Sequence, residues 1–129
     1  MAAVLITGAD SGAARLLSLA GHEVSGEAGD ELDVLVINAG AAESFSAALE
    51  EVVRVLESHL PALERSSSPV VVVSGADAVA QGVAAVVAAQ YARTFPRLRI
   101  NAVGGGAEVV ARAAQVGPEG PSGEFFAAL

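Results

Sequence analysis

The sequence contains no cysteine, and this absence removes several chemistries at once. Without thiols the chain forms no disulfide, offers no thiolate nucleophile and builds no zinc finger. Lysine is absent too, because all seven basic residues are arginines. A mechanism that needs a lysine ammonium therefore has no residue in this chain to supply it.

Long apolar runs and excess positive charge are also missing. Hydrophobic residues make up 53% of the chain, yet no run approaches the roughly 18 to 20 apolar residues of a membrane span, and no export signal is visible. The net charge is −8, whereas nucleic acids and anionic membranes are bound largely through Lys and Arg. We expect a cytoplasmic protein with neither of these partners.

The 129 residues predict a single domain over 1–129, because the chain is too short for two cores. Apolar strand-like runs alternate with helical patterns, which predicts a parallel sheet with helices on both faces. Pro61 is expected to kink its helix or end it early. The expected strands are 2–8, 22–25, 33–40, 70–73 and 97–103, and the expected helices are 11–21, 43–65, 76–93 and 108–115.

Three stretches, in order, resemble the short-chain dehydrogenase/reductase family, Rossmann-type enzymes that move hydride between NAD(P) and an alcohol or ketone. "TGADSGAAR" is similar to that family's T-G-x-x-x-G-x-G turn, "DVLVINAG" to its N-A-G strand end, and "LRINAVGGG" to its R-V-N-A-V-x-P-G strand. "HLPALERSSSPVVVVSG" and the C-terminal "GPSGEFFAAL" resemble further family segments. The resemblance implies a Rossmann-like fold.

The resemblance also implies that the chain is a truncated member, about half the usual length. The family's helix, outer strand and helix between "HEVS" and "DVLVINAG" have no counterpart here. Loss of that outer strand leaves about five parallel strands in the flavodoxin-like order 2-1-3-4-5, within three layers. It also makes "HEVS" a short edge strand, the kind a sheet tolerates.

A second deletion affects the chemistry that the resemblance implies. The family uses a Tyr-x-x-x-Lys pair, with a Ser that polarises the carbonyl and an Asn that organises a proton relay. The one tyrosine, Tyr91, has Phe95 four residues later. Counted back from "LRINAV", the family's Tyr, Lys, Ser and Asn positions fall on Val73, Asp77, Gly75 and Ala48.

The cofactor site implied by the resemblance is partly kept. Gly8 and Gly12 suit a tight turn against a pyrophosphate, and a helix that begins at Ser11 would direct N–H groups at an anion. The acid that would bind ribose is replaced by Ala28, so a weakened NAD(P) or phosphate site and a purely structural glycine turn both stay open. The residues that would line the site are Gly8, Asp10, Ser11, Gly12, Asn38, Ala39 and Gly40.

Charged residues elsewhere give no second site. Glu50, Glu51 and Glu57 are interpreted as a solvated helix face, with Arg54 spaced to pair with them. No His, Asp or Glu cluster has the spacing of metal ligands, so we expect no metal site.

The helix expected over 76–93 is apolar almost all round, which is unusual for a surface helix. Either the C-terminal "EFFAAL" covers its outer side or another protein does. In the family, this helix and the preceding long one pack against a partner subunit. We expect a homodimer, or a dimer with a short-chain-dehydrogenase-type partner, through residues 43–65 and 76–93.

Three functional hypotheses follow. The first is a redox-inactive protein that acts by association, as a dimer or as the non-catalytic partner of an active biosynthetic enzyme. The second is a non-redox cyclase, dehydratase or isomerase that uses the former cofactor cleft. The third, least supported, is an NAD(P)-dependent oxidoreductase. For the second, the candidate catalytic residues are Asp10, Asn38, Ser74 and Asp77.

Overall fold

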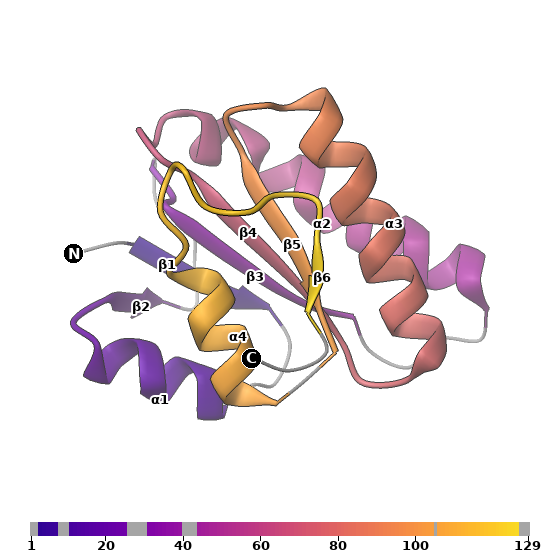
Figure 1. Cartoon of the computed structure of the whole chain (residues 1–129), viewed down its shortest axis with the longest axis horizontal. Coiled ribbons are helices and arrows are strands. Elements are labelled where there is room, and N and C mark those ends of the chain that lie inside the picture. The colour runs from indigo at the N-terminus through magenta and orange to yellow at the C-terminus, as the bar shows by residue number, and fades with distance from the viewer. Residues whose placement is uncertain (1–2, 8–10, 26–30, 40–43, 105, 127–129) are drawn as a thin grey trace.

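The structure, a computed structural model, describes residues 3–7, 11–25, 31–39, 44–104 and 106–126, with only the backbone described at 11–14 and 23–25. Its helices and strands alternate along the chain except at β2 and β3, which follow one another (Figure 1). In chain order they are β1 (Ala3–Thr7), α1 (Ser11–Leu19), β2 (Glu23–Ser25), β3 (Val34–Ala39), α2 (Phe45–Glu64), β4 (Val70–Gly75), α3 (Ala78–Thr94), β5 (Arg99–Val103), α4 (Ala107–Ala114) and β6 (Phe125–Phe126).

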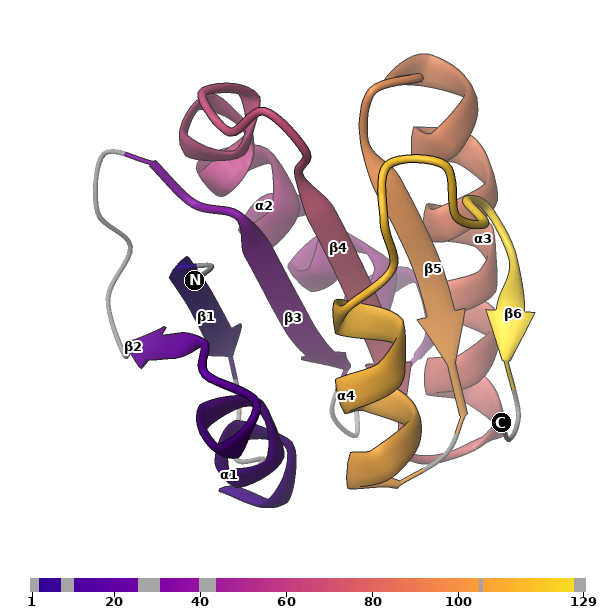
Figure 2. The ribbon, with the colours of Figure 1, turned by 60° about the vertical axis from the view of Figure 1, so that its left-hand side comes forward.

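The described strands form one parallel sheet in the order β2-β1-β3-β4-β5-β6 (Figure 2). The predicted order of the first five strands is therefore confirmed, as is the short edge strand β2, which pairs only with β1. The sheet has a sixth strand that the sequence did not predict. It consists of two residues, Phe125 and Phe126, paired with Ala102 and Val103 of β5.

The C-terminal segment is held along β5 by buried polar contacts. The side chain of Asn101, fully buried, donates from Nδ2 to the Pro121 carbonyl (2.9 Å) and accepts at Oδ1 from the Glu124 N–H (3.0 Å). Ser122 Oγ accepts from the Ile100 N–H (3.1 Å). The expected docking of Phe125 and Phe126 is thus seen, whereas Leu129 lies outside the described residues.

Two apolar layers enclose the sheet because successive side chains of a strand point to opposite faces. On one face, residues of β3, β4 and β5 pack against α2 and α3; on the other, α1 and α4 cover the sheet (Figures 1 and 2). The first face carries Leu35, Ile37, Val71 and Val73, and the second carries Val34, Val36, Val70 and Val72.

Of the two effects expected of Pro61, a kink or an early end of the helix, the early end is not seen, and the helix ends close to the expected residue 65. α2 continues through Pro61 to Glu64. Proline removes one backbone donor but leaves the residues after it free to stay helical. Here Ala62 and Leu63 are buried against the core, and the Ala62 carbonyl accepts the Leu32 N–H (3.0 Å), so tertiary contacts hold the last turn in place.

The connection between β4 and α3 is as short as predicted. Only Ala76 and Asp77 separate the strand from the helix. Asp77 caps the helix, since its Oδ1 accepts the Ala80 N–H (2.8 Å). A Cβ at Gly75 would lie 2.5 Å from the backbone carbon of Ala80 and from the nitrogen of Gln81, so the first turn of α3 rests directly on the strand end.

We predict that Gly75→Ala destabilises the fold by roughly 3 kcal/mol, because backbone on both sides of the contact leaves no flexible group to move aside. Urea unfolding followed by circular dichroism measures this change. Gly117→Ala is the matched control, since a Cβ there meets nothing within 4 Å. It should change stability by less than about 0.5 kcal/mol. Equal effects of the two substitutions would contradict the close approach at Gly75.

Candidate functional site

The candidate site lies where β1, β3 and β4 end, at the carboxyl edge of the parallel sheet. Ligands of open α/β sheets bind outside this edge. Of the residues predicted for a cofactor, Asn38 and Ala39 end β3, and Ser11 and Gly12 begin α1. Gly8, Asp10 and Gly40 lie outside the described residues.

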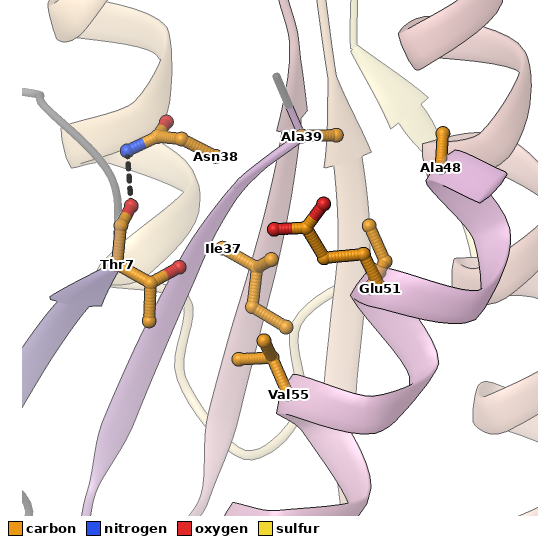
Figure 3. A pocket seen from close by; sticks show the side chains of 8 residues that line it. Thr7, Ile37, Asn38, Ala39, Ala48, Glu51 and Val55 are labelled. Atoms are coloured by element: carbon orange, nitrogen blue, oxygen red, sulfur yellow. Dashed lines mark hydrogen bonds between the residues drawn. The ribbon is translucent and has the colours of Figure 1, made fainter. Parts of the chain in front are cut away.

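Asn38 joins the ends of two neighbouring strands. Its Nδ2 donates to the Thr7 carbonyl at 2.8 Å, which ties the end of β3 to the end of β1 (Figure 3). The Thr7 hydroxyl in turn donates to the Val36 carbonyl at 3.4 Å. Both side chains therefore have a structural role, because each joins the end of β1 to the end of β3.

Beside this pair the structure has a pocket of about 120 Å³ between β3 and α2. Figure 3 shows the Glu51 carboxylate reaching from α2 toward the end of β3. The lining residues are Thr7, Ile37, Asn38, Ala39, Ala48, Glu51, Val52 and Val55. The pocket thus combines five apolar residues with one carboxylate and a few neutral polar atoms.

Glu51 is a pocket residue that was not predicted from the sequence to lie at the site. The sequence placed Glu51 on a solvated helix face, and the residue is indeed exposed. However, Glu51 comes three residues after Ala48 and four before Val55, and residues at these spacings share a helix face. Because Ala48 and Val55 line the pocket, that spacing was the available signal.

The other predicted catalytic residues are only partly brought together. Ser74 of β4 pairs in register with Asn38 of β3, so these two lie side by side at the sheet edge. Asp77 is near the same edge but is engaged in capping α3. Asp10 lies outside the described residues.

Tyr91 lies far from this edge. α3 begins beside the carboxyl end of β4 and runs away from it, so Tyr91 is about 20 Å along the helix from Ala78. Its ring stacks on Phe95, with 5.8 Å between ring centroids. Burial, together with the charge of Glu57, raises the pKa of the Tyr91 phenol above its ordinary value of 10.0. A raised pKa is the opposite of what an activated tyrosine acid needs.

Val73, one of the positions matched to the family's catalytic pair, lies within β4 and is fully buried. Ala48, matched to the relay Asn, lines the pocket but offers no polar atom.

The described residues contain no group of three or more His, Cys, Asp or Glu side chains that could hold a metal ion. No helix in the described part of the chain is both long and apolar enough to cross a membrane.

Comparisons with known proteins identify structural similarity to a solved enzyme. No protein-family model matches the sequence, and no curated protein matches it. The solved structure of salutaridine reductase from Papaver somniferum, a short-chain dehydrogenase/reductase, superposes with a TM-score of 0.73 at 14% sequence identity. The chain has a short-chain dehydrogenase/reductase-like Rossmann fold.

The predicted α/β fold class is therefore confirmed. At 14% identity the likeness concerns the fold and not the activity. The superposition covers 98% of this chain and 99% of the other, so it lends no support to the predicted deletions, which stay predictions.

We predict that the phenol of Tyr91 titrates with a midpoint above pH 10, because burial disfavours the phenolate. The chain has one tyrosine, so ultraviolet absorbance of the phenolate reports this group alone. A midpoint at or below 10 would contradict the burial of the ring.

The same shift makes stability depend on pH. Because the folded state keeps the proton to higher pH than the unfolded state, this contribution is complete below pH 10 and is lost as the pH rises past the folded pKa. Tyr91→Phe has no proton to lose, so its melting temperature should fall less than that of the parent between about pH 9 and 11.

Proposed function

We propose that this chain is a redox-inactive protein that acts by association, through the outer faces of α2 and α3. Two features weigh against hydride transfer by the family's mechanism. The sequence contains no lysine, and its one tyrosine lies toward the end of α3 that is remote from the candidate site. Because this chain has the fold but lacks the family's Tyr and Lys pair, it is better suited to bind a partner than to act as a dehydrogenase.

The observation that carries the proposal is an exposed apolar cluster on α3 and the start of α2. Val79 is 47% exposed and Val86 is 49% exposed, and Phe45 at the start of α2 is 43% exposed. Gly82 lies between the two valines on the same helix face, and a Cβ at Gly82 would be 3.5 Å from the Phe45 ring. These four residues, Phe45, Val79, Gly82 and Val86, form what we call the α2/α3 cluster.

The part of α3 that carries the cluster is free of charge. No charged residue occurs between Asp77 and Arg93, and Ala78 and Ala89 add further small exposed positions. A contiguous exposed apolar patch on a helix face is typical of protein interfaces. Two copies related by a two-fold axis would each present the same cluster to the other.

The C-terminal segment does not cover this cluster in the described part of the chain. It lies on another side of α3, where a Cβ at Gly123 would be 3.1 Å from the Ala92 side chain. Phe125 is itself 41% exposed. The alternative that residues 124–129 shield the outer face of α3 therefore has no support from the described residues.

We predict that the protein elutes at twice the 12.8 kDa of one chain in sizing chromatography with light scattering. Val79→Glu with Val86→Glu should convert it to a monomer, because each contact would bury an unpaired carboxylate. Leu19→Glu is the matched control: Leu19 is 75% exposed on α1, on the opposite face of the sheet, and should leave the dimer intact.

A monomer at every concentration would overturn self-association. It would leave association with a short-chain-dehydrogenase-type partner. If the protein associates with such a partner, a companion dehydrogenase should co-purify with the parent protein from the native host. It should not co-purify with the variant that carries both Val79→Glu and Val86→Glu.

NAD(P) binding is the second property to test. The chain carries a net charge of −8 and the pocket described above contains the Glu51 carboxylate, both of which oppose a pyrophosphate. We predict that millimolar NADH or NADPH raises the melting temperature by less than about 1 °C. A clear concentration-dependent increase would favour the oxidoreductase hypothesis.

The non-redox enzyme is the second candidate function. The pocket supports it, because Glu51, Thr7 and Asn38 place a carboxylate near neutral polar atoms and beside apolar side chains. A cyclase, dehydratase or isomerase needs a positioned acid or base of this kind. Glu51, Asn38 and Ser74 are the described residues on which such an activity would depend.

A further inference from the structure

The side-chain polar atoms that face the pocket between β3 and α2 are acceptors. The amide of Asn38 does not belong to this set, because it points toward the Thr7 carbonyl of β1 and away from Glu51 (Figure 3). Thr7 uses its hydroxyl proton on the Val36 carbonyl, which leaves the oxygen lone pairs. The Glu51 carboxylate accepts only. A ligand that fits this set must supply hydrogen-bond donors.

Charge points to the same class of ligand. Glu51 is the one ionisable side chain among the described residues that line the pocket. Within the described chain no salt bridge neutralises it, although Arg54 follows one turn later at the helix surface. A cation that enters the pocket would therefore meet a carboxylate with no competing basic group in the wall.

The remaining wall limits the size and polarity of the ligand. Ile37 and Val52 are each 2% exposed, and Ala48 is 4% exposed, so the inner wall is buried and apolar. The volume of about 120 Å³ has room for a short chain of about five heavy atoms. An apolar wall with a carboxylate at the rim suits a molecule with an alkyl body and one charged end.

We propose that this pocket binds a small primary alkylammonium ion. The ammonium lies at the carboxyl edge of the sheet and donates to the Glu51 carboxylate and to the Thr7 hydroxyl oxygen. The alkyl chain packs on Ile37 and Val52. The proposal is independent of association through the α2/α3 cluster, because its test compares ligand binding in variants of Glu51 and changes no residue of that cluster.

The test is a titration of ¹⁵N-labelled protein with n-butylammonium chloride, followed by two-dimensional NMR. Saturable shifts are expected for backbone amides of residues 37–39 and 48–52, at concentrations below about 50 mM. Sodium butyrate has a chain of similar length and the opposite charge, and it should bind at least about tenfold more weakly. Butyltrimethylammonium keeps the charge but has no N–H donors, and it should also bind more weakly.

Two variants assign the effect to one carboxylate. Glu51→Gln should weaken n-butylammonium binding about tenfold. Glu50→Gln makes the same change at the next residue of α2, which is exposed and not part of the pocket lining, and should leave affinity within about twofold. Both positions are exposed, so neither change threatens folding.

Three results would overturn the proposal. They are the absence of saturable shifts at these amides, butyrate binding as tight as that of n-butylammonium, and equal affinity of the Glu51→Gln and Glu50→Gln variants. Binding of butyltrimethylammonium as tight as that of n-butylammonium would also contradict the proposal, because the proposed ligand is recognised through its N–H donors.

Discussion

The contact between the end of β4 and the first turn of α3 decides how the rest of this structure is arranged. The missing side chain of Gly75 lets the backbone at Ala80 and Gln81 rest on the strand. With only two residues between strand and helix, Asp77 has to serve as the helix cap. α3 then leads directly away from the carboxyl edge and takes Tyr91 with it. The short connection between β4 and α3 thus places the one tyrosine far from the site.

A second constraint shapes the site itself. The ends of β1 and β3 are joined through the amide of Asn38, so this residue is committed to holding two strands together. The polar side-chain atoms that face the pocket beside it are the Thr7 hydroxyl oxygen, whose proton is donated to Val36, and the Glu51 carboxylate from α2. From the sequence, the glycine pattern near this edge was open to two interpretations, a weakened phosphate site or a purely structural turn. The described side chains favour the charge opposite to that of a phosphate, and the glycine at position 8 lies outside the part that the structure describes.

The positions of the five main strands followed from the sequence because they depend on local patterns, valine runs and glycine breaks. Their order and the edge position of β2 followed from the family resemblance, through the loss of its outer strand. Three other features did not follow from the sequence, and each depends on tertiary contacts. β6 is two residues long and exists because Asn101 anchors the chain around it. α2 passes Pro61 because Ala62 and Leu63 are buried. Glu51 becomes a pocket residue only when α2 packs beside β3.

The distribution of charge connects the fold with association. Two copies that each carry a net charge of −8 repel one another, and this repulsion is weakest where neither surface presents a carboxylate. The outward side of α2 carries Glu50 and Glu57, whereas α3 has no charged residue from Ala78 to Ala92. A partner, whether a second copy or a related protein, can therefore approach closely over α3. The exposed Val79 and Val86 lie on that same helix, so the face with the least repulsion is also one with apolar area to bury.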